Sequence, residues 1–584
     1  MLIVYDFEVF EKDWLVVFTE LTTGFSYEFV NDSEALKEFY EDNKENLFIG
    51  FNNKRYDDYI FKGILLGVEP KKISDIIIEE ENIMKLWRMY DMNKYQLFSM
   101  DIMQNGGWAS LKELEGFIGL DIEESSVPFD IKRPLTEEEI EDVLFYCRHD
   151  VKATVEVVKK SIDEIKTKMT LVNEFGLTKA DLRRSGAQLS EKILGAFTVK
   201  DFDDELEPFV KPDEMKIERY KDVLRFYTHP LSGKLNYERH KKRTIAGVPH
   251  ILAYGGIHGA RENFHYEGKL MLLDVSSYYP SLMIHYDYMS RGVPKKFKER
   301  FKDIYNTRLR MKAEGKSGAD HYKLILNTTY GCMKNVHNGL YDPRNANNVC
   351  IAGQLFLIDL IERIEPYCKL VQSNTDGILV IPYDEDKILE KMHEWSERTR
   401  MPIEPEYYTA IYQKDVNNYI MVADNGYVVL KGGMVSQSNI NGGDVGKGRQ
   451  SRAIVDDAVV NYFVKKQSVE ETIYGERDPL RFQIISKTGN SFYKTIWNYD
   501  GEVHEVQKVN RVFATKDKKA GRLLKVKSVP LKDGDGHEDR FTLPANTPDH
   551  AMLVNNGVND FDMDMLDRKW YIELAKDRIR QYEG

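Results

Sequence analysis

The stretch KLMLLDVSSYYPSLM, residues 269–283, decides how this chain is interpreted. Its apolar beginning predicts a buried strand, and Asp274 closes that strand. Hydroxyl side chains follow, and Pro280 suits the first turn of a helix. A carboxylate at the end of an apolar strand is costly unless it is paired or bound to a metal. Asp274 is therefore a candidate metal ligand; the alternative is that it only caps the following helix.

A second carboxylate lies in a predicted hairpin about a hundred residues later. KLVQSNTDGILVIPY, residues 369–383, has two apolar arms around N-T-D-G, which is a strong turn signal. Asp376 lies at its tip, where simple turn chemistry is the alternative explanation. If the hairpin pairs beside the strand that ends at Asp274, the two carboxylates can bridge metals roughly 3.5–4 Å apart, as phosphoryl transfer requires.

Between these acids, two helical patterns are predicted at about 297–314 and 318–335. Within the second, Lys323, Asn327 and Tyr330 fall at i, i+4 and i+7 and share one stripe. The lysine can neutralise a triphosphate, and the tyrosine can form a surface for a base pair. The alternative is a helix with a snorkelling lysine and a core tyrosine.

A separate group of acids lies near the N-terminus. Asp6 and Glu8 are two residues apart in the opening strand, so both point to one face. Asp57 follows the strand-like LFIGF, and Tyr146 and Asp150 are i and i+4 on a helix that begins near PLTEEE. Each pattern alone favours a structural role. Together, four carboxylates suffice for two metals that hydrolyse a phosphodiester.

These patterns match two sets of motifs from one family. Three segments resemble motifs A, B and C of family B DNA polymerases. They are D-x-x-S-x-Y-P-S at Asp274–Ser281, K-x-x-x-N-T-x-Y-G at Lys323–Gly331 and N-T-D at Asn374–Asp376. D-x-E, N-x-x-Y-D and Y-x-x-x-D resemble the DEDD-type 3′→5′ exonuclease domain of the same family. The resemblance, greatest to compact bacteriophage members, covers residues 6 to 376 in the family's order and implies DNA replication.

The resemblance implies a role for each matched residue. Asp274, Asp376 and the carbonyl of Val275 would hold two Mg²⁺ or Mn²⁺ ions for nucleotide addition, and Tyr279 would exclude a ribose 2′-hydroxyl. The implied dNTP-binding residues are Ser277, Tyr279, Lys312, Lys323, Asn327 and Tyr330, with Arg308 one turn before Lys312. For the exonuclease, the resemblance implies that Asp6, Glu8 and Asp150 bind one metal and that Asp57 helps to bind the other. Tyr146 would orient the attacking water, and Asn53 would touch the frayed strand.

The expected fold is α/β and α+β multidomain, with an RNase H-like exonuclease domain and a right-hand polymerase. Residues 1–165 would form the exonuclease and 166–260 a connecting segment. The palm would comprise 261–295 and 365–415, the fingers 296–364, and the thumb and C-terminal region 416–584.

Motif C departs from the family's usual Y-x-D-T-D-S. The chain has Gln372, Asn374 and Gly377 at three of these positions, so the first acid is absent. We expect altered metal preference with activity retained. The alternative is an exonuclease whose degenerate polymerase module only binds DNA. Only 48 residues separate Asp274 from Lys323, which leaves no room for the insertion that protein-primed relatives use.

The composition shapes the expected partners and location. The 584 residues carry a net charge of −13, but 291–316 holds ten Lys and Arg against three acids, and 508–527 holds eight against one. Such patches can contact nucleic acid, although solvated helix or loop faces are the alternative. Four scattered cysteines favour the cytoplasm, that of the host if viral, and no run reaches membrane-spanning length. The resemblance implies a monomer that binds primed template DNA and single-stranded 3′ ends, with replication accessory proteins as further candidate partners.

Overall fold

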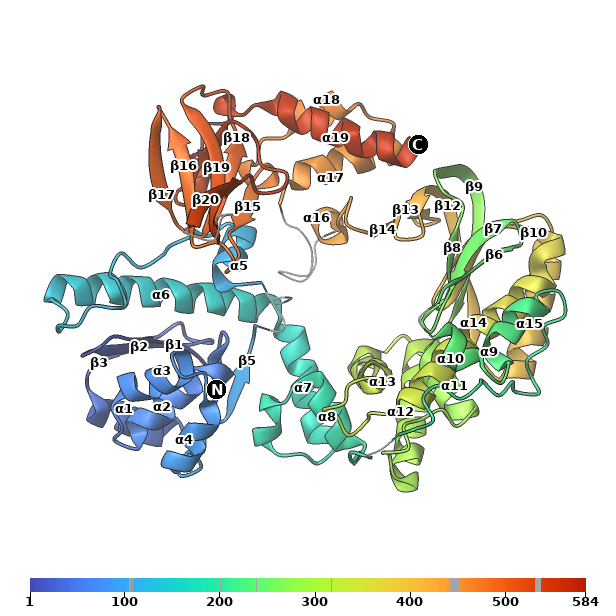
Figure 1. The fold of residues 1–584 in the computed structure, drawn as a ribbon, viewed down its shortest axis with the longest axis horizontal. Helices are drawn as coiled ribbons and strands as arrows, with labels where there is room; N and C mark the ends of the chain where they lie inside the picture. The colour runs from blue at the N-terminus through green and yellow to red at the C-terminus, as the bar shows by residue number, and fades with distance from the viewer. Residues whose placement is uncertain are drawn as a thin grey trace. The chain divides into compact units, whose positions relative to one another are not determined.

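The computed structural model describes residues 1–103, 107, 109–199, 202–237, 239–316, 318–441, 451–530 and 537–584. As predicted, the chain is a mixed α/β protein with more than one compact unit (Figure 1). The first unit combines Met1–Arg183 with Ser436–Asp577, and the second combines Arg184–Val435 with Arg578–Gly584. Each unit is described by itself below.

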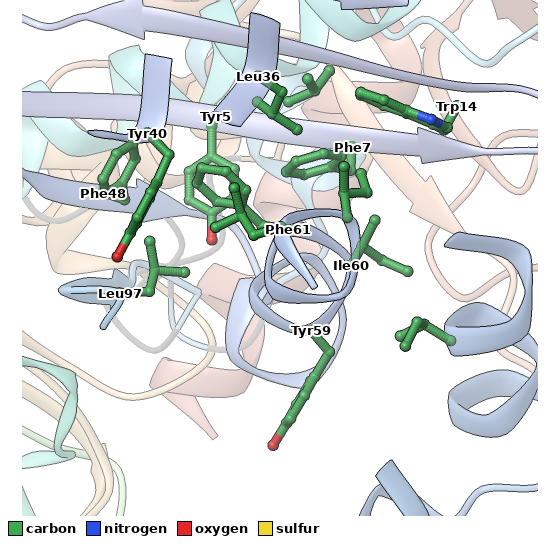
Figure 2. Close-up of a cluster of buried hydrophobic side chains, with 14 of the residues drawn as sticks. Tyr5, Phe7, Trp14, Leu36, Tyr40, Phe48, Tyr59, Ile60, Phe61 and Leu97 are labelled. Carbon is green, nitrogen blue, oxygen red and sulfur yellow. The ribbon is translucent and has the colours of Figure 1, made fainter. Parts of the chain in front are cut away.

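The first unit begins with a five-stranded sheet of order β3-β2-β1-β4-β5. Its strands are β1 (Leu2–Val9), β2 (Trp14–Glu20), β3 (Ser26–Val30), β4 (Leu47–Gly50) and β5 (Ser99–Asp101). β1 is antiparallel to β2 and parallel to β4. Figure 2 shows Phe61 of α2 (Asp57–Leu65) against Tyr5 and Phe7 of β1, with ring centroids 6.1 and 5.6 Å away. This aromatic core fixes α2 beneath the strand that carries Asp6 and Glu8.

Helices complete this part of the first unit. They are α1 (Ser33–Asn43), α3 (Pro70–Ile78), α4 (Ile83–Met89), α5 (Leu111–Ile118), α6 (Glu137–Lys160) and α7 (Ile162–Glu174). α6 begins where PLTEEE predicts, with a capping box between Thr136 and Glu139. It packs on β1 and β2, which brings Asp150 to the acids of β1.

The C-terminal segment of the first unit contains two further sheets among the described residues. One has the order β15 (Ile484–Lys487), β18 (Val509–Ala514), β21 (Ala551–Leu553); the other has β17 (Glu502–Val506), β16 (Lys494–Tyr499), β19 (Ala520–Pro530), β20 (His537–Thr542). Its helices are α16 (Gln437–Asn441), α17 (Ala453–Val460), α18 (Val469–Gly475) and most of α19 (Arg568–Glu583).

The second unit is built on a nine-stranded antiparallel sheet of order β14-β13-β12-β9-β11-β10-β8-β7-β6. The strands are β6 (Lys241–Ile245), β7 (Val248–Leu252), β8 (His258–Ala260), β9 (Phe264–Val275), β10 (Cys368–Asn374), β11 (Gly377–Pro382), β12 (Ile403–Asp415), β13 (Asn418–Ala423) and β14 (Val428–Lys431). β9, whose last residues begin the stretch quoted first, lies centrally between β11 and β12.

The helices of the second unit include the predicted pair. They are α8 (Gly186–Ile193), α9 (Lys221–Thr228), α10 (Ser232–Asn236), α11 (Tyr278–His285), α12 (Lys295–Ala313), α13 (Ala319–Cys332), α14 (Pro343–Ile364) and α15 (Glu385–Thr399). α12 and α13 pack on each other (Figure 1), and α14 is buried along most of its length. Among the described residues, every helix is too short or too polar to cross a bilayer.

Candidate active sites

The first candidate site lies where β9 meets the β10–β11 hairpin. Gly377 pairs with Asp274 across the sheet, and the Val275 amide donates to the Asp376 carbonyl at 2.9 Å. The prediction that the hairpin pairs beside the Asp274 strand is therefore confirmed. Both carboxylates line one cleft of about 330 Å³ in the second unit.

Other walls of this cleft come from α11, α12 and α13. The predicted nucleotide-site residues that line it are Val275, Ser277, Tyr279, Lys312, Lys323, Asn327 and Tyr330, and Arg308 is there too. Asp274 and Asp376 are a hundred residues apart in sequence, yet the fold brings them to one cavity with a cationic wall. The site thus combines acids that suit divalent metals with cations that suit phosphates.

The turn between β9 and α11 holds hydroxyl groups against the basic helix α12. Ser277 has a left-handed backbone, with φ of 52°, which is uncommon outside glycine. Arg308 Nη1 donates to Ser277 Oγ at 2.5 Å, and Lys312 Nζ donates to Ser276 Oγ at 3.1 Å. This turn therefore presents two cations beside the acids of the cleft.

Two tyrosines form a rigid aromatic wall. The rings of Tyr279 and Tyr330 meet edge to face, with centroids 4.4 Å apart. The Tyr330 hydroxyl contacts the Cys350 sulfur at 2.6 Å, and Gly353 of α14 leaves room for Tyr279, since an added Cβ would lie 3.2 Å from that ring. Burial raises the pKa of both phenols, so they remain neutral.

The charges of this cleft favour a bound cation. Burial and the nearby Asp376 raise the pKa of Asp274 to about 6, and burial also raises the pKa of Asp376. Glu404 of β12 pairs with Asp274 across the sheet and accepts a hydrogen bond from Lys312 at 3.2 Å. Glu404 and Glu406 add to the negative field around Asp274. Neither acid was identified from the sequence, because strand register alone brings them here.

Asn374, the departure in motif C, lies near two titratable side chains. Burial lowers the pKa of His258 of β8 and raises that of Tyr419 of β13, and the Asn374 amide opposes both shifts. A neutral amide thus occupies this position of the hairpin. Charge near Asp376 comes instead from the cations Lys323 and Lys431, which lower its pKa against the effect of burial.

The second candidate site lies in the first unit. Asp6 and Glu8 of β1 and Asp150 of α6 have carboxylate oxygens within 4.8 Å of one another. They line a cleft of about 740 Å³ together with Asp57, the first residue of α2. Three carboxylates at this spacing can hold a divalent cation. The i, i+2 geometry predicted for Asp6 and Glu8 is present, with both side chains on the cleft side of the sheet.

Burial raises the pKa values of the acidic side chains at this site. Burial raises the pKa of Asp57 to about 7, although its carboxylate accepts a hydrogen bond from the Phe7 amide at 3.2 Å. Burial raises the pKa of Asp150 to about 6 against the opposing effect of Lys112, and that of Tyr146 rises well above its ordinary value. Tyr146 is therefore a neutral phenol that can donate to water or to Asp150.

Lys112 of α5 is a residue of this site that was not identified from the sequence. Its Nζ lies 2.5 Å from Asp150 Oδ1, 3.1 Å from Glu115 Oε1 and 4.5 Å from the centre of the Tyr146 ring. The lysine therefore offsets part of the negative charge of the carboxylates, and it contacts two predicted catalytic side chains, Asp150 and Tyr146. Its local sequence, S-L-K-E, carries only a helix-capping signal, which points to no chemistry.

Asn53 does not lie in the cleft, so its predicted contact with a DNA strand is wrong. Its side chain is fully buried and donates to the Tyr5 hydroxyl at 3.1 Å and to Asp58 Oδ1 at 2.9 Å. Asp58 also accepts from Ser99 at 2.6 Å. Asn53 therefore belongs to a polar cluster under the sheet, and its neighbour Asn52 lines the cleft instead.

Comparisons with known proteins give limited information. No protein-family model matches the chain, and no curated protein does. Among solved structures, the family B DNA polymerase from the hyperthermophilic archaeon Pyrobaculum calidifontis is similar, with a TM-score of 0.43 and 13% identity, over 99% of this chain and 77% of that one. A likeness of this size does not determine function, so the residues of the two clefts must carry the argument.

Proposed function

We propose that the chain is a template-directed DNA polymerase of family B with a 3′→5′ proofreading exonuclease, of the compact bacteriophage type. One observation carries the proposal: Asp274 and Asp376 converge in a cleft whose other walls are a cationic stripe and a pair of tyrosines. Acids for metals, cations for a triphosphate and a flat wall for a nucleoside are the parts that nucleotide addition needs.

In nucleotide addition, Asp274, Asp376 and the Val275 carbonyl would hold two Mg²⁺ or Mn²⁺ ions. Such ions, when bound, stabilise charge on the attacking and leaving oxygens. Lys323 and Lys312 neutralise the dNTP triphosphate, with Arg308 beside them. Tyr279 packs against the deoxyribose, where a 2′-hydroxyl would collide with its ring, and Tyr330 supports Tyr279 from behind.

In proofreading, the cleft of the first unit would receive a single-stranded 3′ end. Asp6, Glu8 and Asp150 would hold one metal ion, and Asp57 would help to hold a second. Tyr146 donates its hydroxyl proton in a hydrogen bond that orients the attacking water. Lys112, which contacts Asp150, would offset negative charge beside the scissile phosphate.

A second candidate function is a nuclease whose polymerase module binds DNA without extending it. Asn374 favours it, since motif C lacks one acid. Against it, Asp274 and Asp376 still face one cleft although Asn374 replaces the acid. The two candidates differ in whether a primer grows.

Extension of a primer with a recessed 3′ end on a longer template decides between the two candidate functions. We expect extension with dNTPs and Mg²⁺ by the wild type, a loss of at least about 1,000-fold in Asp274→Asn, and no change in the exposed control Asp424→Asn. Degradation of a single strand by Asp274→Asn should persist. Degradation without any extension by the wild type would establish the second candidate and reject the first.

A further inference from the structure

α5, the helix that carries Lys112, contacts two parts of the first unit that are distant in sequence. It packs on α6, where Lys112 reaches Asp150. It also lies against β15 (Figure 1) and β18 of the C-terminal segment. Gly116 makes this approach close, since an added Cβ would lie 2.6 Å from the Ile485 side chain. The C-terminal segment thus packs directly on the helix that carries Lys112.

Arg511 of β18 is the centre of this contact. Its guanidinium is fully buried and donates to the carbonyls of Leu120 at 2.5 Å and Asn555 at 3.0 Å, and to Gln483 Oε1 at 2.8 Å. Burial lowers its pKa to about 10, so it remains charged at neutral pH. A buried cation that donates to carbonyls at a helix C-terminus also complements the helix dipole.

The chain that follows α5 is fixed by further hydrogen bonds to the same segment. The Ile122 amide donates to the Asn555 carbonyl, and Gln507 Nε2 donates to the Ile122 carbonyl, both at 3.0 Å. The Gly557 amide donates to Asp121 Oδ1 at 2.9 Å. At the start of α5, Lys487 pairs with Glu113 at 2.6 Å. Both ends of the helix are therefore held by residues beyond 480.

α5 needs such support because of its length. It has eight residues, about two turns, and a helix this short is marginal without packing. Lys112 can reach Asp150 only while α5 keeps its position on α6. Displacement of a catalytic group by about 1 Å can cost roughly 100-fold in rate.

We propose that the C-terminal segment positions the nuclease site, with Arg511 acting through α5 and Lys112. The proposal rests on the exonuclease function proposed above and extends it: residues 451–577 are then part of the proofreading machinery, although none of their described side chains lines its cleft. Arg511 is a positioning residue, because it touches neither the candidate metal ligands nor the space for the substrate.

The test compares degradation of a single-stranded oligonucleotide by full-length variants. Arg511→Met should lower kcat about 10-fold or more and leave KM within about twofold, because Lys112 moves while the cleft that binds DNA remains. The matched control is Arg477→Met, an exposed arginine of the same segment, which should behave as the wild type. Equal kcat for Arg511→Met and wild type would overturn the proposal.

A double-mutant cycle tests the route through Lys112. In a Lys112→Met background, Arg511→Met should cause little further loss, since the group that it positions is absent. A second full loss in that background would overturn the proposal by showing that Arg511 acts elsewhere. If Arg511→Met does not fold, Gln507→Ala replaces it, with an expected loss of about threefold that also disappears in the Lys112→Met background; no loss at all would overturn the proposal.

Amide hydrogen exchange measures the stability of α5 independently of enzyme activity. Amides 111–118 should exchange faster in Arg511→Met than in Arg477→Met, while those of α6 keep their protection. Unchanged exchange in α5 would overturn the positioning role. If α5 shows this dependence on Arg511 but the wild type degrades no DNA, the proposed exonuclease is rejected, and the positioning role of Arg511 in it falls as well.

Discussion

Asp57 shows how one carboxyl in the cleft of the first unit makes the stability of the protein depend on pH and on metal binding. Its pKa rises from 3.8 to about 7 on folding, so the metal-free folded chain binds more protons than the unfolded chain between these values. Its contribution to the free energy of unfolding therefore falls as pH rises through this window. A bound divalent cation would reverse that loss, since it stabilises the ionised carboxylate.

Asp57→Asn should consequently stabilise the metal-free protein at pH 8, by roughly 1–3 kcal/mol, while abolishing degradation of single strands. The gain should shrink towards pH 4, which is close to the unfolded pKa of 3.8 and well below the folded pKa of about 7. Urea unfolding in a chelator at the two pH values measures it. The control Asp163→Asn replaces a carboxylate that is 94% exposed, and should give no gain. Equal stabilisation by both variants would contradict this account.

Tyr279 is the residue on which sugar selection should depend. It is fixed between Tyr330 and α14, so its ring cannot move aside for a 2′-hydroxyl. Tyr279→Ala should raise the use of rNTPs relative to dNTPs by roughly 10- to 100-fold in single-nucleotide extension. Tyr383→Ala, which removes an exposed tyrosine of the same unit, should leave the ratio unchanged. An unchanged ratio in Tyr279→Ala would mean that another group excludes ribose.

At the scale of elements, the pairing of β9 with β11 determines where Asp274 points. Gly377 lies opposite Asp274, and an added Cβ would lie 3.2 Å from the Leu272 side chain and 3.5 Å from Asp274 Oδ1. Gly377→Val should therefore displace the carboxylate and slow extension by roughly 10- to 100-fold, with single-strand degradation unchanged. Gly475→Val, at a glycine with open space around it, is the control. Full extension by Gly377→Val would show that the β9–β11 register does not constrain the site.

Elements with a local signal could be predicted from the sequence, and residues placed by pairing could not. The turn residues Asn374–Gly377 predicted the hairpin, and the capping segment predicted the start of α6. Glu404 reaches Asp274 through a register set between strands about 130 residues apart, which no local pattern encodes. Asn53 was misplaced because motif spacing does not reveal which side of a short turn faces the core.

Lys112 could not be found from the sequence for a related reason. Its helix is short, and its position depends on α6 on one side and on residues beyond 480 on the other. Such a contact joins segments almost 400 residues apart. The arrangement of side chains around Asp150 therefore depends on tertiary packing as much as on the local motifs.

At the scale of the whole molecule, each candidate site is complete within one compact unit. The acids of the nuclease cleft lie within Met1–Arg183, and those of the polymerase cleft within Arg184–Val435. Neither set of metal ligands draws on the other unit. The two proposed activities should then be separable by substitution, and removal of a mispaired primer end followed by extension should require both.

The double variant Asp6→Ala/Glu8→Ala should therefore lose degradation by at least about 1,000-fold and extend a matched primer at a rate within about twofold of the wild type. On a primer with a mismatched 3′ end, the wild type should excise the last nucleotide before extending, whereas the variant should stall or retain the mismatch. Denaturing gels with 5′-labelled primers distinguish these products. Loss of matched extension in this variant would contradict the independence of the two ligand sets, because no side chain from Met1–Arg183 lines the polymerase cleft among the described residues.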